Sequence, residues 1–231
     1  MSIDHDIERY LRIHLSEIVS QRLIWNVTVP WPSDQQITYM VHKCSGLFII
    51  AYVITKFIGS HHHEPQDRLD LIIDSPDNTV YKGRSGIDVM YFQILLQNFK
   101  DIDTDDTAFF EQFRMVLSSI VLAFNPLSCA SLAAILNTTS DCVCIAINSL
   151  HLVFLIPDSE SESIHISHKS IADFFTSLTR CTDPRFYIDP SIYHLKLGMC
   201  CLALMNELLT RNICDLPAYA MNKDIHDLGE R

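Results

Sequence analysis

The stretch Ile164-His165-Ile166-Ser167-His168-Lys169-Ser170-Ile171-Ala172-Asp173-Phe174-Phe175 decides the fold of this chain. Its first residues alternate between apolar and polar, which is the period of a strand with one buried face. Its second half has the period of an amphipathic helix, and His168 stands where the two patterns meet. The sequence therefore predicts a short strand that leads directly into a helix, with a histidine at the junction.

Three helices and a second strand are predicted immediately upstream of this junction. Asn125-Pro126-Leu127-Ser128 ends the first helix and caps the second, at 130–136, and the third follows Ser140. Strands at 153–156 and 164–167 enclose a polar loop. The order helix, helix, helix, strand, loop, strand predicts a winged helix. Its core residues are expected to be Phe110, Phe113, Leu117, Ile120, Val121 and Phe124 in the first helix and Val143, Ile147 and Leu150 in the third.

The residues before the winged helix have the pattern of a helical subdomain. The chain opens with an amphipathic helix, and Ser33 followed by Gln36 is a capping box that predicts a second helix running to about Ile58. A short helix around residues 68–74 and a longer one follow, and the acidic run 101–106 marks a boundary. The longer helix carries one apolar stripe made of Ile87, Met90, Tyr91, Ile94 and Leu95.

After a turn at 181–184, a last long helix is predicted that is apolar on most sides. Such a helix is expected to pack against other elements on several faces. Its apolar residues include Tyr193, Leu197, Cys200, Cys201, Leu204 and Leu208. We therefore expect a mainly α fold in three parts. They are a helical subdomain at 1–103, a winged-helix domain with a small β-hairpin at 104–180, and the start of a further helical domain at 181–231.

Charge and composition narrow the classes of partner. A formal net charge of -11 disfavours general binding to nucleic acid or to an anionic membrane, since both require clustered Lys and Arg. The apolar run Gly46–Ile58 is too short to cross a bilayer. The eight cysteines follow no secretory signal, so reduced thiols and a cytoplasmic location are expected. No metal site is expected, because Cys142-x-Cys144 lacks zinc spacing and His61-His62-His63 fits a solvated turn.

The junction at His168 resembles the winged helix of STAND-class signalling ATPases, the NACHT and NB-ARC proteins. Ser170, Asp173 and Phe174 match the family's helix start, and Ile171 stands where a Phe is usual. Further segments resemble fungal NACHT proteins over nearly the whole chain. They are Asp6-Ile7-Glu8-Arg9-Tyr10-Leu11-Arg12, Trp31-Pro32, Gly46-Leu47-Phe48-Ile49 and the ten residues from Arg180 to Asp189, which resemble a strand that follows the winged helix.

This resemblance implies that His168 contacts the β-phosphate of ADP and holds a closed state. The chain itself has no G-x-x-x-x-G-K-[ST] loop, so it is expected to bind no cofactor alone and not to be an enzyme. ADP or ATP would be held by a NACHT ATPase core, a partner in cis or in trans. The implied function is a regulatory and oligomerisation module for signalling or self/non-self defence, with a homo-oligomer as one expected assembly.

Gly46 and Phe48 are further candidate nucleotide-sensing residues. NB-ARC proteins carry Gly-Leu-Pro-Leu here, whereas Phe48 follows Gly46-Leu47 in this chain. Phe48 has an aromatic face for a purine, but its place in an apolar helical stripe favours the core. Two alternatives stay open: a winged helix that binds nucleic acid, and a fragment or decoy that acts only through protein contacts.

Overall fold

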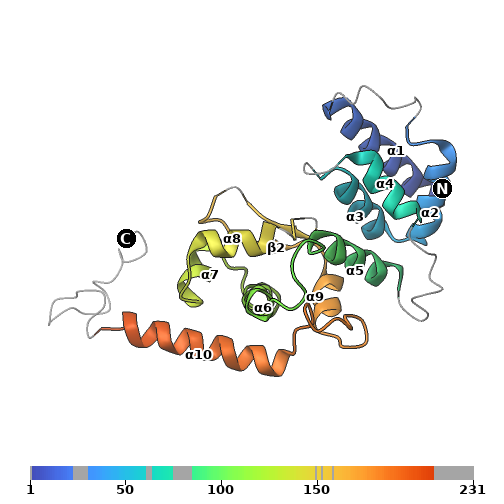
Figure 1. Ribbon diagram of the computed structural model, residues 1–231. Helices are drawn as coiled ribbons and strands as arrows, with labels where there is room; N and C mark the ends of the chain where they lie inside the picture. Colours follow the sequence, from blue (N-terminus) through green and yellow to red (C-terminus); the bar gives the residue numbers. More distant parts are fainter. Residues whose placement is uncertain are drawn as a thin grey trace.

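The computed structural model describes residues 2–22, 31–60, 64–74, 85–148, 150–151, 153–157 and 159–210. Within them the chain is mainly helical, with ten α-helices and one two-stranded antiparallel sheet (Figure 1). The expected fold class is confirmed at this level. The predicted histidine turn at 61–63 and the last residues of the predicted C-terminal domain, 211–231, lie outside the described residues.

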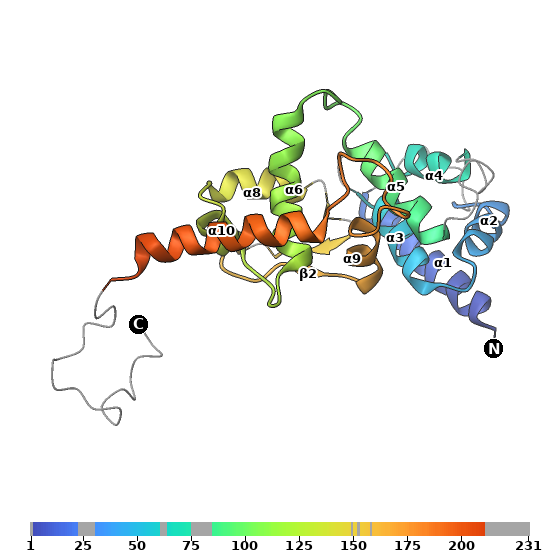
Figure 2. The same ribbon diagram turned by 90° about the horizontal axis from the view of Figure 1, so that it is seen from below.

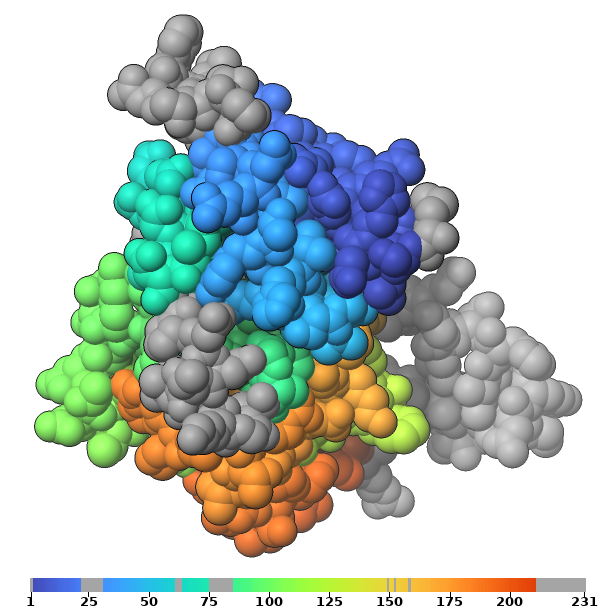
Figure 3. Space-filling model, turned by 90° about the vertical axis from the view of Figure 1, so that its right-hand side faces the viewer, coloured from blue at the N-terminus to red at the C-terminus, as the bar shows by residue number. Residues whose placement is uncertain are grey.

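Five helices form the N-terminal part of the molecule. They are α1 (Ile3–Arg22), α2 (Asp34–Cys44), α3 (Phe48–Ile58), α4 (Pro65–Asp74) and α5 (Gly86–Asn98). The central helix is α3, which packs against the other four and buries Ile50, Ala51, Val53, Ile54 and Ile58. A helix that is apolar on nearly all sides is stable only when it is covered in this way. The first four helices, blue to teal, and the segment after β2, orange, occupy opposite halves of the face shown in Figure 3.

The capping box at Ser33 and Gln36 is confirmed, but the prediction of one helix from Ser33 to Ile58 is wrong. The helix ends at Cys44 because Ser45 and Gly46 both adopt left-handed backbone angles, with φ of 48° and 76°. Such a pair of residues ends a helix and reverses the chain. The resulting turn lets α2 and α3 pack against each other and against α1.

The second group of elements follows the predicted order, with helices α6 (Thr107–Leu122), α7 (Cys129–Ile135) and α8 (Ser140–Asn148), strands β1 (Phe154–Leu155) and β2 (His165–Ile166), and α9 (Lys169–Phe175). Helix α8 packs on α6 and α7, and β2 touches α6 and α9. The predicted core residues Val143, Ile147 and Leu150 are buried.

The hairpin is shorter than predicted. Phe154 pairs with Ile166, and Leu155 pairs with His165. The next residue upstream of β2, Ile164, instead donates its backbone N–H to the carbonyl of Leu127 at 2.9 Å. Backbone groups must be paired when buried, and here the segment before α7 competes with β1 for that pairing. The hairpin therefore ends early and is bonded to the chain that enters α7.

An aromatic cluster joins α6 to the chain beyond α9. The ring of Phe99 lies 4.8 Å from that of Phe113 and 5.3 Å from that of Phe186. The predicted strand around Phe186 is wrong, because Asp183 accepts hydrogen bonds from the backbone N–H of Arg185 and Phe186 and forms a turn. The prediction that Phe124 belongs to the core is also wrong. It lies beyond the end of α6 and is 99% exposed.

The last described helix, α10 (Pro190–Leu208), crosses α6 and extends away from the molecule (Figure 2). Tyr193 is its one buried residue. Two contacts fix α10 to α6: the ion pair of Lys196 with Glu111, and a 2.8 Å hydrogen bond that Arg114 donates to the hydroxyl of Tyr193. Its exposed apolar side chains are Ile192, Leu195, Met199, Leu202, Met205 and Leu208.

Among the described residues, no single helix is both long enough and apolar enough to cross a membrane. Helices α7 and α8 reach that length and apolar composition only when taken together, and they are bent by 116° relative to each other.

Candidate functional site at the junction of α5 and α9

His168 caps the N-terminus of α9. Its backbone is extended, with φ of -157°, and its Nδ1 accepts a hydrogen bond from the backbone N–H of Ser170 at 3.2 Å. This is the role that Ser, Thr, Asp or Asn usually fills. The Oγ of Ser170 lies 2.7 Å from the same Nδ1. The predicted arrangement of strand, histidine and helix is therefore confirmed, and the histidine has a local structural role.

A hydrogen-bonded relay connects His168 to α5. The hydroxyl of Tyr91 lies 2.9 Å from the Oγ of Ser170. Burial raises the pKa of Tyr91 to about 12, so the phenol keeps its proton at neutral pH. Because Nδ1 already accepts the backbone N–H, Ser170 donates to it and in turn accepts from Tyr91. This order places the proton of neutral His168 on Nε2, the atom that can donate to an incoming anion.

An ion pair spans the same junction. Arg180 donates from Nε and Nη2 to the carboxylate of Asp88, at 3.0 and 2.6 Å, and it lies 4.0 Å from Asp173 of α9. The side chain of Asp88 is 5% exposed and that of Arg180 is 27% exposed. The hydrogen bond with Asp88 raises the pKa of Arg180, which keeps its guanidinium charged. The ring of Tyr91 also lies 5.5 Å from that of Phe174.

Gly46 and Phe48 lie elsewhere, at the turn between α2 and α3. The backbone of Gly46 has a φ of 76°, which favours glycine, and Phe48 begins α3. The expectation that Phe48 is a core residue is wrong. Its side chain is 42% exposed, and its ring meets that of Tyr10 edge-on at 6.0 Å. The hydrogen bonds of His168 lead to Tyr91 on α5, so its described polar contacts do not join it to Gly46 or Phe48.

The sequence did not indicate Asp88, Tyr91 or Arg180 as members of a site. Asp88 interrupts an apolar helix, which is a weak signal that a buried acid has a partner. That partner is 92 residues away, and no spacing rule connects the two. Among the described residues, no group of three His, Cys, Asp or Glu side chains is arranged to hold a metal ion.

No protein-family model, curated protein or solved structure matches this chain.

Proposed function

We propose that this chain is the regulatory and oligomerisation module of a STAND-class nucleotide switch. In this proposal residues 1–103 are its helical subdomain, 104–180 its winged helix and 181–231 the start of a further helical domain. One observation supports it most: the Tyr91–Ser170–His168 relay, which fixes the ring of an exposed histidine at the contact between the first two parts. The strand–His–helix junction resembles that of NACHT proteins, and this resemblance suggests the β-phosphate of ADP as the ligand of His168.

In the proposed closed state, an ATPase core supplied in cis or in trans holds ADP against this junction. The Nε2–H of His168 donates to a phosphate oxygen, and the relay behind it keeps the ring from rotating. Exchange of ADP for ATP removes the contact and favours the open state. A ligand shifts such an equilibrium only through a difference in affinity between the two states, and His168 supplies that difference.

The proposed partner is another protein, not nucleic acid. Helix α8, at Ser140–Asn148, occupies the place of a recognition helix but contains no Arg or Lys. The hairpin loop carries Glu160 and Glu162, where phosphate contact requires basic residues. A net charge of -11 also disfavours binding to nucleic acid.

The experiment uses the 231-residue chain and a separately purified fungal NACHT ATPase core. Isothermal titration calorimetry measures the affinity between them with the core loaded in turn with ADP, with a non-hydrolysable ATP analogue and with no nucleotide. The expected result is tighter binding to the ADP-loaded core by about tenfold or more, which corresponds to one charge-assisted hydrogen bond. Equal affinity in the three states would exclude nucleotide sensing by this chain.

Substitutions identify the sensing atom. His168→Asn keeps an N-cap for α9 but has no Nε2–H, so it is expected to fold normally and to lose the preference for ADP. His151→Asn is the matched control, since His151 contacts the carbonyl of Asn148, outside the relay. Tyr91→Phe frees the relay and is expected to weaken the preference partly. An ADP preference unchanged by His168→Asn would contradict the assignment.

A further inference from the structure

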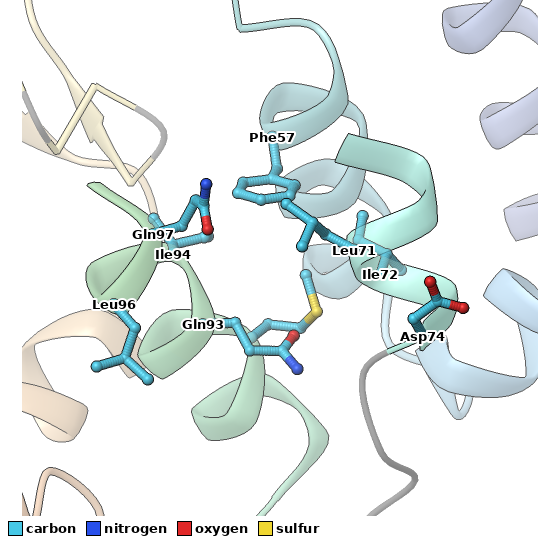
Figure 4. Close-up of a pocket in the computed structure, with 9 residues that line it drawn as sticks. Phe57, Leu71, Ile72, Asp74, Gln93, Ile94, Leu96 and Gln97 are labelled. Atoms are coloured by element: carbon cyan, nitrogen blue, oxygen red, sulfur yellow. The ribbon is translucent and has the colours of Figure 1, made fainter. Parts of the chain in front are cut away.

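Two features of the described residues take no part in the junction at His168. A cavity of about 310 Å³ lies among α3, α4 and α5, with Phe57 and Ile72 in its apolar wall (Figure 4). Asp74 is the one charged side chain among the described residues that line it, and a single carboxylate beside apolar groups specifies no class of ligand. The second feature is a pair of cysteine thiols on α7 and α8, whose chemistry is specific.

The thiols of Cys129 and Cys144 lie side by side. Cys129 is the first residue of α7, and Cys144 belongs to α8, which packs against it. The thiol of Cys144 donates a hydrogen bond to the Sγ of Cys129, with 3.8 Å between the two sulfur atoms. The sulfur atoms of a disulfide are about 2.05 Å apart, so these two need to approach by less than about 2 Å.

The two thiols differ in their access to solvent. Cys129 is 3% exposed, whereas Cys144 is only partly buried. Burial, together with the hydrogen bond from Cys144, raises the pKa of Cys129 to about 11, so this thiol keeps its proton at neutral pH. Oxidants react with accessible thiolates, so Cys129 is protected from direct attack. Cys144 is the member of the pair that an oxidant in solution reaches.

We infer that Cys129 and Cys144 form an oxidation site, at which a peroxide converts the two thiols into a disulfide between α7 and α8. In the first step the sulfur of Cys144 attacks an oxygen of hydrogen peroxide. An S–O bond forms, the O–O bond breaks, and the departing hydroxide takes the thiol proton and leaves as water.

The second step joins the two cysteines. The sulfur of Cys129 attacks the sulfur of the sulfenic acid on Cys144, so that an S–S bond forms and the S–O bond breaks. The departing hydroxide takes the proton of Cys129 and leaves as a second water. The two sulfur atoms together lose two electrons, and the peroxide gains them.

The disulfide would close a loop of 15 residues and fix α7 to α8. The next residue after Cys129, Ala130, donates its backbone N–H to the carbonyl of Glu160 in the hairpin loop at 3.1 Å. Oxidation therefore also secures the start of α7 beside that loop. Neither thiol belongs to the Tyr91–Ser170–His168 relay, so this inference does not rest on the proposed sensing of ADP.

Peptide mapping of the oxidised protein tests the site. The 231-residue chain at low micromolar concentration, without nucleotide or ATPase core, is treated with millimolar hydrogen peroxide and digested without reductant. Mass spectrometry is expected to find Cys129 joined to Cys144 as the main disulfide, and dithiothreitol is expected to reverse it. Absence of a disulfide, or a main disulfide between any other two cysteines, would overturn the inference.

Dimedone, which labels sulfenic acids, identifies the order of the two steps. In Cys129→Ala the sulfenic acid on Cys144 has no partner, so its labelling is expected to rise at least about tenfold above that of the wild type. Labelling of Cys144 that Cys129→Ala leaves unchanged would show that Cys129 is not its partner. Cys144→Ser, at the more exposed position, is expected to keep the fold and to leave Cys129 a free thiol after peroxide treatment.

Cys142→Ser is the matched control. Cys142 lies two residues from Cys144, on another face of α8, and its thiol contacts Thr139. This variant is expected to form the disulfide between Cys129 and Cys144 as the wild type does. The oxidised wild type is expected to unfold roughly 5–10 °C above the reduced protein, the effect of closing a loop of this length. A lower unfolding temperature after oxidation would show that the native packing does not accommodate the bond.

Discussion

Asp88 and Arg180 are 92 residues apart in the sequence, yet they form a two-pronged ion pair that joins α5 to the chain beyond α9. The acid is nearly buried, and the base keeps partial access to solvent. Tyr91, one helical turn after Asp88, makes the second polar contact across the same junction. The contact between the two groups of helices therefore depends on specific polar pairs as well as on apolar packing.

Removing one member of this pair is expected to destabilise the fold. Asp88→Asn leaves Arg180 without its countercharge, and we expect a loss of about 2–3 kcal/mol in the free energy of unfolding. Urea denaturation measures it, and the double variant with Arg180→Met isolates the coupling between the residues. Arg12→Ala is the control, because its partners Glu8 and Asp34 are 40% and 84% exposed, and such surface pairs each contribute less than about 1 kcal/mol. Equal losses for Asp88→Asn and Arg12→Ala would contradict this account.

Gly46 and Gly198 are expected to respond oppositely to the same substitution. Gly46→Ala forces a Cβ into a left-handed position and is expected to cost about 1–2 kcal/mol. Gly198 lies inside α10, and a Cβ there would meet nothing within 4 Å. Gly198→Ala is therefore expected to stabilise the helix by about 0.5–1 kcal/mol. Thermal unfolding measures both, and a stabilising Gly46→Ala would refute the proposed role of the turn.

The anchor of α10 is expected to weaken in acid. The hydrogen bond from Lys196 holds the pKa of Glu111 below its ordinary value of 4.5, with a further contribution from Arg114. A depressed pKa in the folded state stabilises the fold above the unfolded value, and this stability is lost as the pH falls through 4.5 towards the folded value. Between pH 7 and pH 3, the free energy of unfolding, measured by urea denaturation, is expected to fall less steeply for Glu111→Gln than for the wild type. Parallel pH profiles would contradict this role.

The cysteines are expected to differ in their reactivity with iodoacetamide. Burial raises the pKa of Cys44 to about 12 and, with the neighbouring Cys144, that of Cys129 to about 11. A hydrogen bond with Thr139 lowers the pKa of Cys142. Because the thiolate is the nucleophile, Cys142 is expected to react at least about tenfold faster than Cys129 at pH 8. Mass spectrometry of peptides measures the rates. In urea the difference is expected to disappear, and its persistence there would rule out a folded-state cause.

Local pattern was enough to predict much of the secondary structure. The capping box at Ser33, the helix–hairpin–helix order and the cap position of His168 all depend on neighbours within a few residues, which the sequence displays directly. The turn at Ser45 was missed because an apolar run continues across it, and periodicity alone does not reveal a reversal between two buried helices.

The candidate site around His168 was predictable only in part, because local pattern does not reveal contacts between residues far apart in the sequence. His168 was identified from its local motif, but its partners Ser170 and Tyr91 meet across 79 residues, as do Arg114 and Tyr193. Phe48 was assigned to the core because its position in α3 fits an apolar stripe. Only the packed structure shows that Phe48 is partly exposed while Ile50 and Ala51, in the same helical turn, are fully buried.

The exposed apolar side chains of α10 have an energetic consequence for the molecule as a whole. Six large apolar side chains on this helix are each 50–67% exposed. Full burial of such a side chain is worth about 1.5–3 kcal/mol, so each retains on the order of 1 kcal/mol of transfer free energy. The total for one helix approaches the net stability of an ordinary domain, about 5–15 kcal/mol. A layer packed over α10 would therefore be held by a driving force comparable to the one that keeps the rest of the fold together.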